Sequence, residues 1–194
     1  MEFLVGLVFG VVFVSPCVFI YVTFVKGIDR FEPEPLWLLT VMFIWGAFVS
    51  TSAAIVIGGI GEGFISAFTG LPRSDPLFDA TSATVMAPVV EEGAKTFGLI
   101  LLWALSAAWL KELDGPLDGA IYGGIVGLGF TLTEDILYVA GAMAQGGFGQ
   151  SAATFFVRTI LAGLGHASFT ALAGLGIGIA VESRSPLVKF LAPV

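Results

Sequence analysis

The chain has 194 residues, of which 57% are hydrophobic and only 12% are charged, and its mean hydropathy is +0.98. Soluble domains carry roughly 25% charged residues, so this composition excludes an ordinary soluble globule, a disordered chain and a coiled coil. The net charge of −7 offers no basic surface for nucleic acid, and the single cysteine, Cys17, allows neither an internal disulfide nor a cysteine-based metal site. A polytopic membrane protein remains.

Five stretches of the sequence are long and apolar enough to form membrane-spanning helices, which need about 20 mostly apolar residues. In chain order they cover residues 3–25, 36–60, 82–110, 119–142 and 153–181. No basic residue precedes the first stretch, so we interpret it as a retained helix rather than a signal peptide. The pattern predicts an all-α fold: a polytopic integral membrane helical bundle in a single domain, residues 1–194, with at least five transmembrane helices.

The connecting segments are expected at residues 26–34, 61–81, 111–118 and 145–151. The longest, 61–81, contains two prolines and several charges, and we expect an interfacial helix at about 64–68 within it. The tail from Glu182 begins charged and turns apolar at Leu187. Either this tail ends on the membrane surface, or it begins a sixth helix that is truncated at the C-terminus.

Basic residues in the connecting segments predict the orientation, because cytoplasmic loops carry an excess of Lys and Arg. One side has five, in segments 26–34 and 111–118 and in the tail: Lys26, Arg30, Lys111, Arg184 and Lys189. The opposite side has Arg73 alone. We therefore expect a multi-pass protein of the cell membrane, with its N-terminus outside and its C-terminal tail in the cytoplasm.

Charged residues and the single histidine lie inside the last three predicted helices, whereas the first two contain none. They are Glu91, Glu92 and Lys95 in the third, Glu134 and Asp135 in the fourth, and Arg158 and His166 in the fifth. A charge at the bilayer centre costs about 2.5–3.5 kcal/mol on insertion scales, and such residues are functional by default. At 1.5 Å per residue, the two glutamates 91 and 134 and His166 lie roughly 12–20 Å below the outer boundary, so we expect them to converge in one layer. Arg158 is expected either to snorkel outward or to pair with an acid near the rim.

Helical spacing gives each of these helices a polar stripe. The pairs three or four residues apart are Glu91 and Glu92 with Lys95, Glu134 with Tyr138, and His166 with Thr170. On the fourth helix, Gly119, Gly123 and Gly127 share the face that leads to Glu134. Because small residues permit close helix contacts in membranes, this face predicts tight packing against a neighbouring helix.

These groups suit hydrolysis by an activated water molecule. Clustered carboxylates in a low dielectric cannot all ionise, so one glutamate can act as general base while a protonated glutamate or His166 donates to the leaving amine. A metal is the alternative, held by Glu91 or Glu92 with Glu134 and His166, although the H-E-x-x-H spacing of common zinc proteases is absent. A proton- or cation-coupled transporter and a non-catalytic membrane scaffold are also compatible with the pattern.

Three motifs follow one another on the third, fourth and fifth predicted helices. Residues 91–95 match E-E-x-x-K, residues 130–138 match F-x-x-x-E-N-x-x-Y with Asp135 in place of the asparagine, and residues 166–170 match H-x-x-x-[ST]. In this order the motifs resemble the PrsW family of intramembrane proteases, which is distantly similar to the CAAX prenyl protease/ABI group. The resemblance covers about residues 82–180, which we expect to form a three-helix catalytic core.

The resemblance implies proteolysis of a single-span, membrane-anchored protein in the lipid bilayer, in some members an anti-sigma factor cleaved on its outer side. It marks as catalytic or site-forming Glu91, Glu92, Glu134 and His166, with Lys95 supporting. We expect three further supporting residues, Asp135, Tyr138 and Thr170. The family has been described both as metal-dependent and as a glutamic type. We favour the glutamic type without a cofactor, and zinc on the four catalytic residues is the alternative. Asp135 departs from the motif and adds a negative charge, which either stays protonated or favours a cation.

Overall fold

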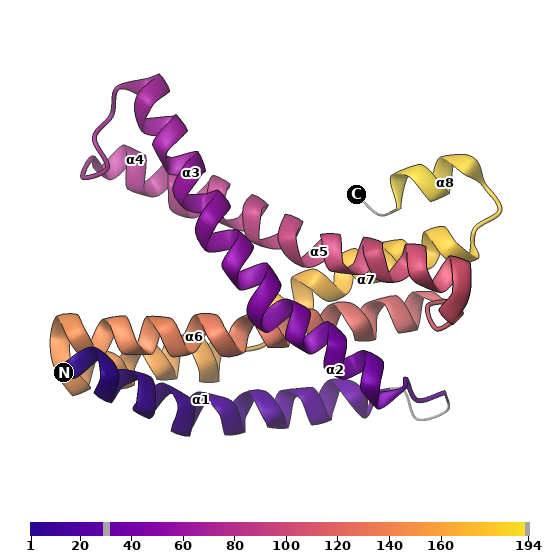
Figure 1. Ribbon diagram of the computed structural model, residues 1–194, viewed down its shortest axis with the longest axis horizontal. Helices are drawn as coiled ribbons and strands as arrows, with labels where there is room; N and C mark the ends of the chain where they lie inside the picture. The colour runs from indigo at the N-terminus through magenta and orange to yellow at the C-terminus, as the bar shows by residue number, and fades with distance from the viewer. Residues whose placement is uncertain (29–31, 193–194) are drawn as a thin grey trace.

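The computed structural model describes residues 1–28 and 32–192, and every regular element in this part of the chain is a helix (Figure 1). The stretches long and apolar enough to cross a membrane are Glu2–Lys26, Leu36–Thr69, Pro76–Leu110 and Pro116–Glu182. The predicted all-α membrane bundle is therefore confirmed. Arg30, one of the residues used to predict the orientation, lies outside the described residues.

The first span is α-helical throughout, whereas the three helical stretches after it also contain π-helical segments. In chain order the elements are α1 (Glu2–Lys26), α2 (Leu36–Ile44), the π-helical η1 (Trp45–Ser50), α3 (Thr51–Thr69), α4 (Pro76–Thr81), η2 (Ser82–Met86), α5 (Ala87–Leu105), η3 (Ser106–Leu110), α6 (Pro116–Phe155), η4 (Phe156–Leu161), α7 (Gly165–Glu182) and α8 (Pro186–Leu191). The π-helical segments continue the α-helices before them, so each widens a turn of a span without reversing the chain. Such segments are frequent at functional sites.

The fourth and fifth predicted spans form a helical hairpin that reverses at Gly147. This residue has φ 70° and ψ −164°, a conformation that glycine adopts readily and other residues avoid. After the turn, Ser151 Oγ donates to the Val139 carbonyl at 2.9 Å, so the returning chain packs against the helix it has just left. The prediction of a loop over residues 145–151 is therefore wrong, because the loop is much shorter than expected. One glycine supplies the reversal, and the residues on both sides keep their helical hydrogen bonds.

The returning half of this hairpin is not the continuous helix expected over residues 153–181. Helical geometry is lost at Ala162 (φ −109°, ψ 2°) and at Leu164 (φ −92°, ψ 0°), and α7 begins at Gly165. His166 consequently lies in the first turn of α7 rather than in the middle of a helix.

The break has a partner on α1. The Tyr21 hydroxyl donates to the Thr159 carbonyl at 2.9 Å. In a continuous helix this carbonyl would accept from the N–H of Gly163, but no such bond is present here. A Cβ added at Gly163 would lie 2.1 Å from the same carbonyl oxygen and 2.7 Å from the tyrosine ring, so the tight packing at the break requires glycine.

The predicted tight packing of the glycine face is confirmed, and α7 is the helix that it contacts. Gly119 faces Gly174, Gly123 faces Thr170 and Gly127 faces His166. A Cβ added at these three glycines would lie 2.1, 2.3 and 2.5 Å from the backbone carbonyl oxygens opposite. Since real Cβ atoms do not approach that closely, these glycines fix the distance between the two helices and the height of His166 along α6.

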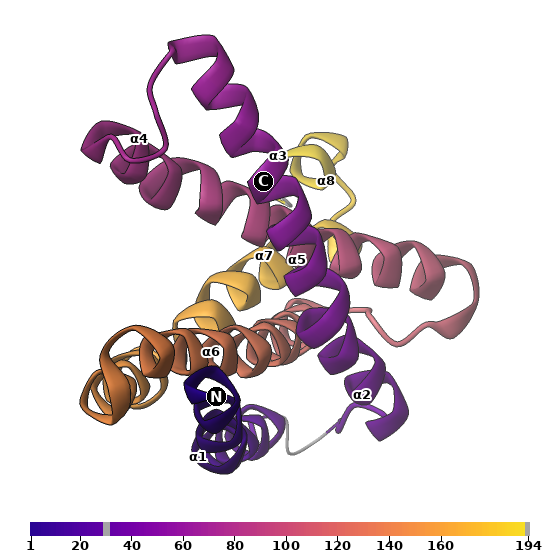
Figure 2. The same ribbon diagram turned by 60° about the vertical axis from the view of Figure 1, so that its left-hand side comes forward.

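The core surrounds α6, with α1 and α7 along it and α2 crossing it (Figures 1 and 2). Tyr122, Ile125 and Leu128 of α6 are at most 1% exposed. On the α1 side, a Cβ at Gly6 would lie 2.7 Å from the Ala140 Cα, so this contact is also a close backbone approach. α6 is therefore held from several sides, which gives the site residues on it a rigid support.

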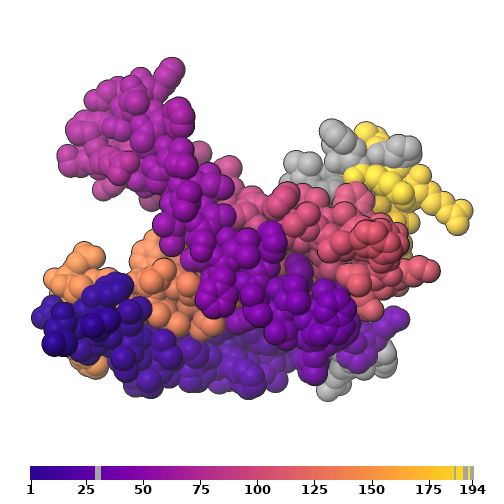
Figure 3. Space-filling view, in the orientation of Figure 1, coloured from indigo at the N-terminus to yellow at the C-terminus, as the bar shows by residue number. Residues whose placement is uncertain are grey.

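The segment expected to be a loop at 61–81 is mostly helical. α3 continues to Thr69 and ends at Gly70 with φ 71°, and α4 starts at Pro76 after the Asp75 side chain accepts from the Leu77 N–H at 2.8 Å. The expected interfacial helix at 64–68 is part of α3, because the sequence has no helix-breaking proline between Pro35 and Pro72. The end of α3 and α4 project away from the bundle as an arm (Figures 1 and 3).

Candidate active site

Lys95 lies at the centre of a polar cluster built from α5, α6 and α7. Its side chain is 0% exposed, and its Nζ lies 2.6 Å from Glu92 Oε1 and 2.8 Å from His166 Nδ1. The ammonium group also lies 3.9 Å from the centroid of the Phe130 ring, a cation–π contact. The lysine thus joins the three helices that carry the sequence motifs.

The π-helical segment η1 holds α5 at the level of this lysine. The indole N–H of Trp45 and the hydroxyl of Ser50 donate to the Ala94 carbonyl at 3.2 and 3.3 Å. One turn further along α5, a Cβ at Gly98 would lie 2.3 Å from the Trp45 indole nitrogen. The second span therefore contributes no charge to the cluster but positions the helix that carries three of its charges.

Both carboxylate oxygens of Glu92 are occupied. Oε1 accepts from the Lys95 ammonium, and Oε2 accepts from the Thr170 hydroxyl at 2.9 Å. Thr170 lies one turn after His166, as the spacing predicted, and its hydrogen bond to Glu92 joins α7 to α5. A carboxylate whose oxygens both accept protein hydrogen bonds is a positioning group rather than a free base.

His166 lies between a cation and a carboxylate. Its Nδ1 is 2.8 Å from Lys95 Nζ, and its Nε2 is 2.9 Å from Glu134 Oε2. Since an ammonium group only donates, we assign Nδ1 as the acceptor and Nε2 as the protonated nitrogen that donates to Glu134. The imidazole also packs edge-on against Phe130, with ring centroids 4.9 Å apart. Its orientation is therefore fixed by three contacts.

Arg158 is part of the cluster and does not snorkel outward. Its Nη2 lies 2.5 Å from Glu134 Oε2, and its Nε lies 2.9 Å from Asp135 Oδ1. Asp135 also accepts from the Thr159 hydroxyl at 2.8 Å, and the guanidinium lies 3.8 Å from the centroid of the Tyr138 ring. The arginine thus restrains the same carboxylate oxygen that contacts the histidine.

These contacts change the interpretation of two supporting residues. Asp135 faces Arg158 and Thr159, so its extra negative charge relative to the motif is matched by a permanent cation. Tyr138 covers Arg158 and is 52% exposed. Arg158 itself was absent from the predicted site. The sequence carried a signal for this contact. Residues 134 and 135 lie about as far before Gly147 as residues 158 and 159 lie after it, so a helical hairpin that turns at Gly147 brings them together.

Glu91 is the least restrained carboxylate of the cluster. Its Oε2 lies 3.9 Å from Lys95 Nζ and 4.0 Å from His166 Nδ1, and in the described structure it makes no hydrogen bond. It borders a hollow of about 310 Å³ between α3, α5 and α6, together with Glu134 and Tyr138. A water molecule or a peptide carbonyl in this hollow can reach the free oxygens of Glu91.

The cluster has an excess of negative groups. Its carboxylates are Glu91, Glu92, Glu134 and Asp135, and its permanent cations are Lys95 and Arg158. No buried side-chain nitrogen or oxygen in the described ranges lacks a hydrogen-bond partner, so the network is internally satisfied. The excess favours further positive charge, carried by protons or by a metal ion.

Glu91, Glu134 and His166 have the donor set for a metal ion. One ligand atom from each, two carboxylate oxygens and one imidazole nitrogen, lies within 4.8 Å of the others. Oxygen and imidazole ligands with a position left for water are typical of catalytic zinc. Glu92, which the sequence included among the alternative ligands, is held instead by Lys95 and Thr170.

Comparisons with known proteins agree with the motifs. A family profile described as "PrsW family intramembrane metalloprotease" matches residues 34–194, a range that contains the whole cluster. "Protease PrsW" of Geobacillus kaustophilus is 28% identical over 159 residues, which cover 80% of this chain and 61% of that protein. "Protease PrsW" of Clostridioides difficile is 32% identical over 115 residues, 59% of this chain and 44% of that protein. The chain thus spans less than two thirds of these relatives, and no solved structure matches it significantly. The match over most of its length nevertheless assigns this chain to the PrsW family.

Proposed function

We propose that this chain is an intramembrane endopeptidase that hydrolyses a peptide bond of a single-span, membrane-anchored protein. The observation that carries the proposal is the meeting of Glu91, Glu134 and His166, from three helices, within 4.8 Å of one another, with both glutamates bordering a hollow. Family membership and the printed names of the relatives support a protease over a transporter or a scaffold.

Glu91 is the proposed general base. It accepts a proton from a water molecule while the water oxygen attacks the carbonyl carbon of the scissile bond, which forms a tetrahedral intermediate. The N–H at His166 Nε2, which donates to Glu134 at 2.9 Å, is the proposed donor to the developing oxyanion or the leaving group once substrate is bound. The proton on Glu91 then passes to the leaving amine, so the products are one carboxylic acid and one amine.

The remaining groups have positioning roles. Lys95 and Glu92 hold His166 and α7 in register, and Arg158 keeps Glu134 oriented toward the imidazole. Buried and mutually hydrogen-bonded charges of this kind are costly to rearrange, so the site is preorganised.

A metal-dependent form of the same reaction is the second candidate, and the family description favours it. Glu91, Glu134 and His166 would hold the ion. A bound zinc ion would polarise the peptide carbonyl and acidify its bound water. In this form Glu92 and Lys95 keep the positioning roles given above.

The position of cleavage follows from the orientation. With the N-terminus outside, as the distribution of basic residues predicts, the cluster lies in the outer half of the bilayer. The substrate would then be cut near its outer juxtamembrane segment, which fits a membrane-anchored regulator such as an anti-sigma factor. Accessibility of a cysteine at position 2 and of one at position 184 to a membrane-impermeant thiol reagent, in a background lacking Cys17, tests this orientation.

The experiment is cleavage in liposomes that contain the purified chain and single-span peptides with a fluorogenic outer segment. Glu91→Gln and His166→Ala are expected to lower kcat at least about 100-fold. Glu182→Gln, the same change at an exposed helix end, is the control and should cleave as wild type does. Full activity in both site variants would refute the assignment of the site.

A chelator separates the two forms of the mechanism. Cleavage that persists with chelator identifies Glu91 as a base in a metal-free site. Cleavage that is lost and then restored by zinc identifies the three residues as ligands. The thermal unfolding temperature of each variant in detergent accompanies these assays, because a scaffold would lose stability without having any activity to lose.

A further inference from the structure

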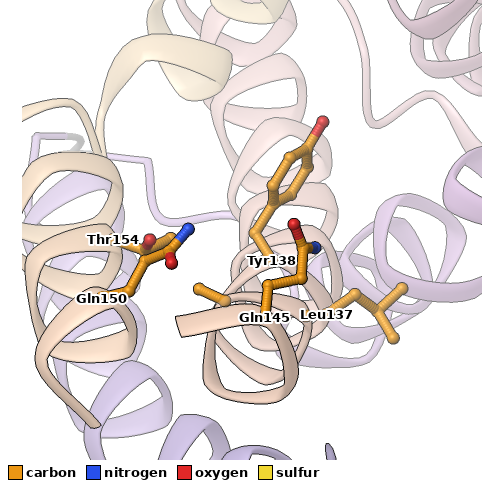
Figure 4. Close-up of a pocket in the computed structure, with 7 residues that line it drawn as sticks. Leu137, Tyr138, Gln145, Gln150 and Thr154 are labelled. Atoms are coloured by element: carbon orange, nitrogen blue, oxygen red, sulfur yellow. The ribbon is translucent and has the colours of Figure 1, made fainter. Parts of the chain in front are cut away.

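A second hollow lies on the outer side of the cluster, where α6 approaches its reversal. It has a volume of about 460 Å³ and is lined by Leu137, Tyr138, Gly141, Ala142, Gln145, Gln150 and Thr154 (Figure 4). Leu137 and Tyr138 also line the hollow that contains Glu91 and Glu134. The two hollows therefore adjoin along α6 and share a wall.

The polar groups of this second hollow are uncharged and available. The amides of Gln145 and Gln150 and the hydroxyl of Thr154 make no hydrogen bond to any described residue. Figure 4 shows the two glutamines and the threonine around the same space, on opposite halves of the hairpin. Together these side chains offer both donors and acceptors, the combination that matches the N–H and C=O groups of a peptide backbone.

The hollow has free space beside Gly141. A Cβ added at Gly141 would meet only the Gln145 amide nitrogen within 4 Å, at 3.9 Å. No charged side chain lines the hollow, so an occupant with charged side chains would find no partner in it. The surface therefore suits a chain segment with small or apolar side chains and a backbone that needs hydrogen bonds.

We propose that the two hollows form one groove that binds an extended segment of the substrate next to the scissile bond, with Glu91 and Glu134 at one end and Gln145, Gln150 and Thr154 at the other. This inference rests on the proposed protease function. A helical segment satisfies its own backbone groups and would leave the amides of Gln145 and Gln150 unused, whereas an extended segment presents an N–H and a C=O at each residue. From Tyr138 to Gln145 the helix rises roughly 10 Å, so the outer hollow takes about three extended residues.

Gly141→Leu tests the groove because it adds a bulky side chain at a lining position where a Cβ meets no atom of the protein closer than 3.9 Å. Gly149→Leu is the matched control, since it lies on the same hairpin, outside the hollow, and a Cβ there meets nothing within 4 Å. We expect Gly141→Leu to raise KM for a single-span peptide by about tenfold or more with kcat little changed, and Gly149→Leu to behave as wild type.

Binding separates this proposal from the catalytic one. In a Glu91→Gln background, the affinity for a fluorescent single-span peptide should fall at least about fivefold when Gln145 and Gln150 are both changed to Ala, as expected for two lost hydrogen bonds. Replacing one backbone amide of the peptide's outer segment by an ester should weaken binding to the Glu91→Gln protein. It should have no further effect once both glutamines are removed.

A photo-crosslinking residue at position 150 provides a readout that does not depend on the folding of Gly141→Leu. It should capture the peptide, whereas the same residue at Val8 should not. Val8 is 65% exposed, and its neighbour Phe9 contacts Phe148 on the same hairpin, so the two positions lie at a similar level. Normal cleavage and binding by Gly141→Leu, or equal capture from both positions, would overturn the groove while leaving the protease proposal standing. Binding that depends on the glutamines without any cleavage would support the groove and overturn the protease.

Discussion

Gly127→Ala is the sharpest test of how the fold positions the site. The added methyl group would lie 2.5 Å from the His166 carbonyl oxygen and 2.6 Å from the Ala167 Cα. Carbon atoms pack at about 3.5–4.0 Å, so α7 has to retreat by about 1 Å at this level. The 2.9 Å contact between His166 Nε2 and Glu134 would then exceed hydrogen-bonding distance.

A displacement of this size costs about 100-fold in rate when it affects a catalytic group, and overpacking costs about 1–3 kcal/mol in stability. We therefore expect kcat in the liposome assay to fall about 100-fold, measured per folded molecule. The unfolding transition in detergent should shift to lower temperature at the same time.

Two neighbouring glycines provide the controls. The Cβ of Gly124→Ala would lie 3.2 Å from the Val25 side chain, which can yield, and 4.0 Å from the Ala167 carbonyl oxygen, an ordinary contact, so activity and stability should change little. Gly119→Ala clashes with the Gly174 carbonyl at 2.1 Å but lies two turns from His166, so it should lower stability with a smaller loss of kcat. Wild-type kcat and unfolding temperature in Gly127→Ala would refute the close backbone contact of α6 with α7.

Three further changes test the charges. Lys95→Met leaves the carboxylate partners of Lys95 without a buried cation. It should lower the free energy of unfolding by about 3 kcal/mol or more, measured by chemical unfolding in detergent. An unchanged unfolding transition would mean that the lysine is not buried as described. Arg158→Lys keeps the charge but cannot contact Glu134 and Asp135 with a planar fork, so kcat/KM should fall roughly 10-fold, and a wild-type value would contradict the positioning role. In the segment before α2, burial raises the pKa of the Glu34 carboxyl from 4.5 to about 7. The folded chain thus holds a proton that the unfolded chain releases, so stability should decline as the pH rises from about 4.5 to 7, and Glu34→Gln should remove this slope in pH-dependent thermal unfolding.

Much of this protein was predictable from local sequence. Hydropathy identified the membrane spans because the transfer of side chains into lipid depends on local composition, and a backbone in lipid has to satisfy its own hydrogen bonds as a helix. Helical spacing placed Glu91, Glu134 and His166 at one depth, and these residues do meet. The glycines at 119, 123 and 127 predicted a close helix contact, since the absence of a side chain is itself the signal.

Only the tertiary structure revealed the features that depend on the register between distant segments. The hairpin at Gly147 brings Arg158 to Glu134, and a bond from Tyr21 accompanies the break that puts His166 at the start of α7. The same packing gives both oxygens of Glu92 hydrogen-bond partners and leaves Glu91 facing a hollow. The two glutamates are adjacent and identical in the sequence, so the sequence could not predict this difference. Hydropathy and periodicity report the depth and the face of each residue, whereas the identity of its partner is fixed by how whole helices turn, break and pack.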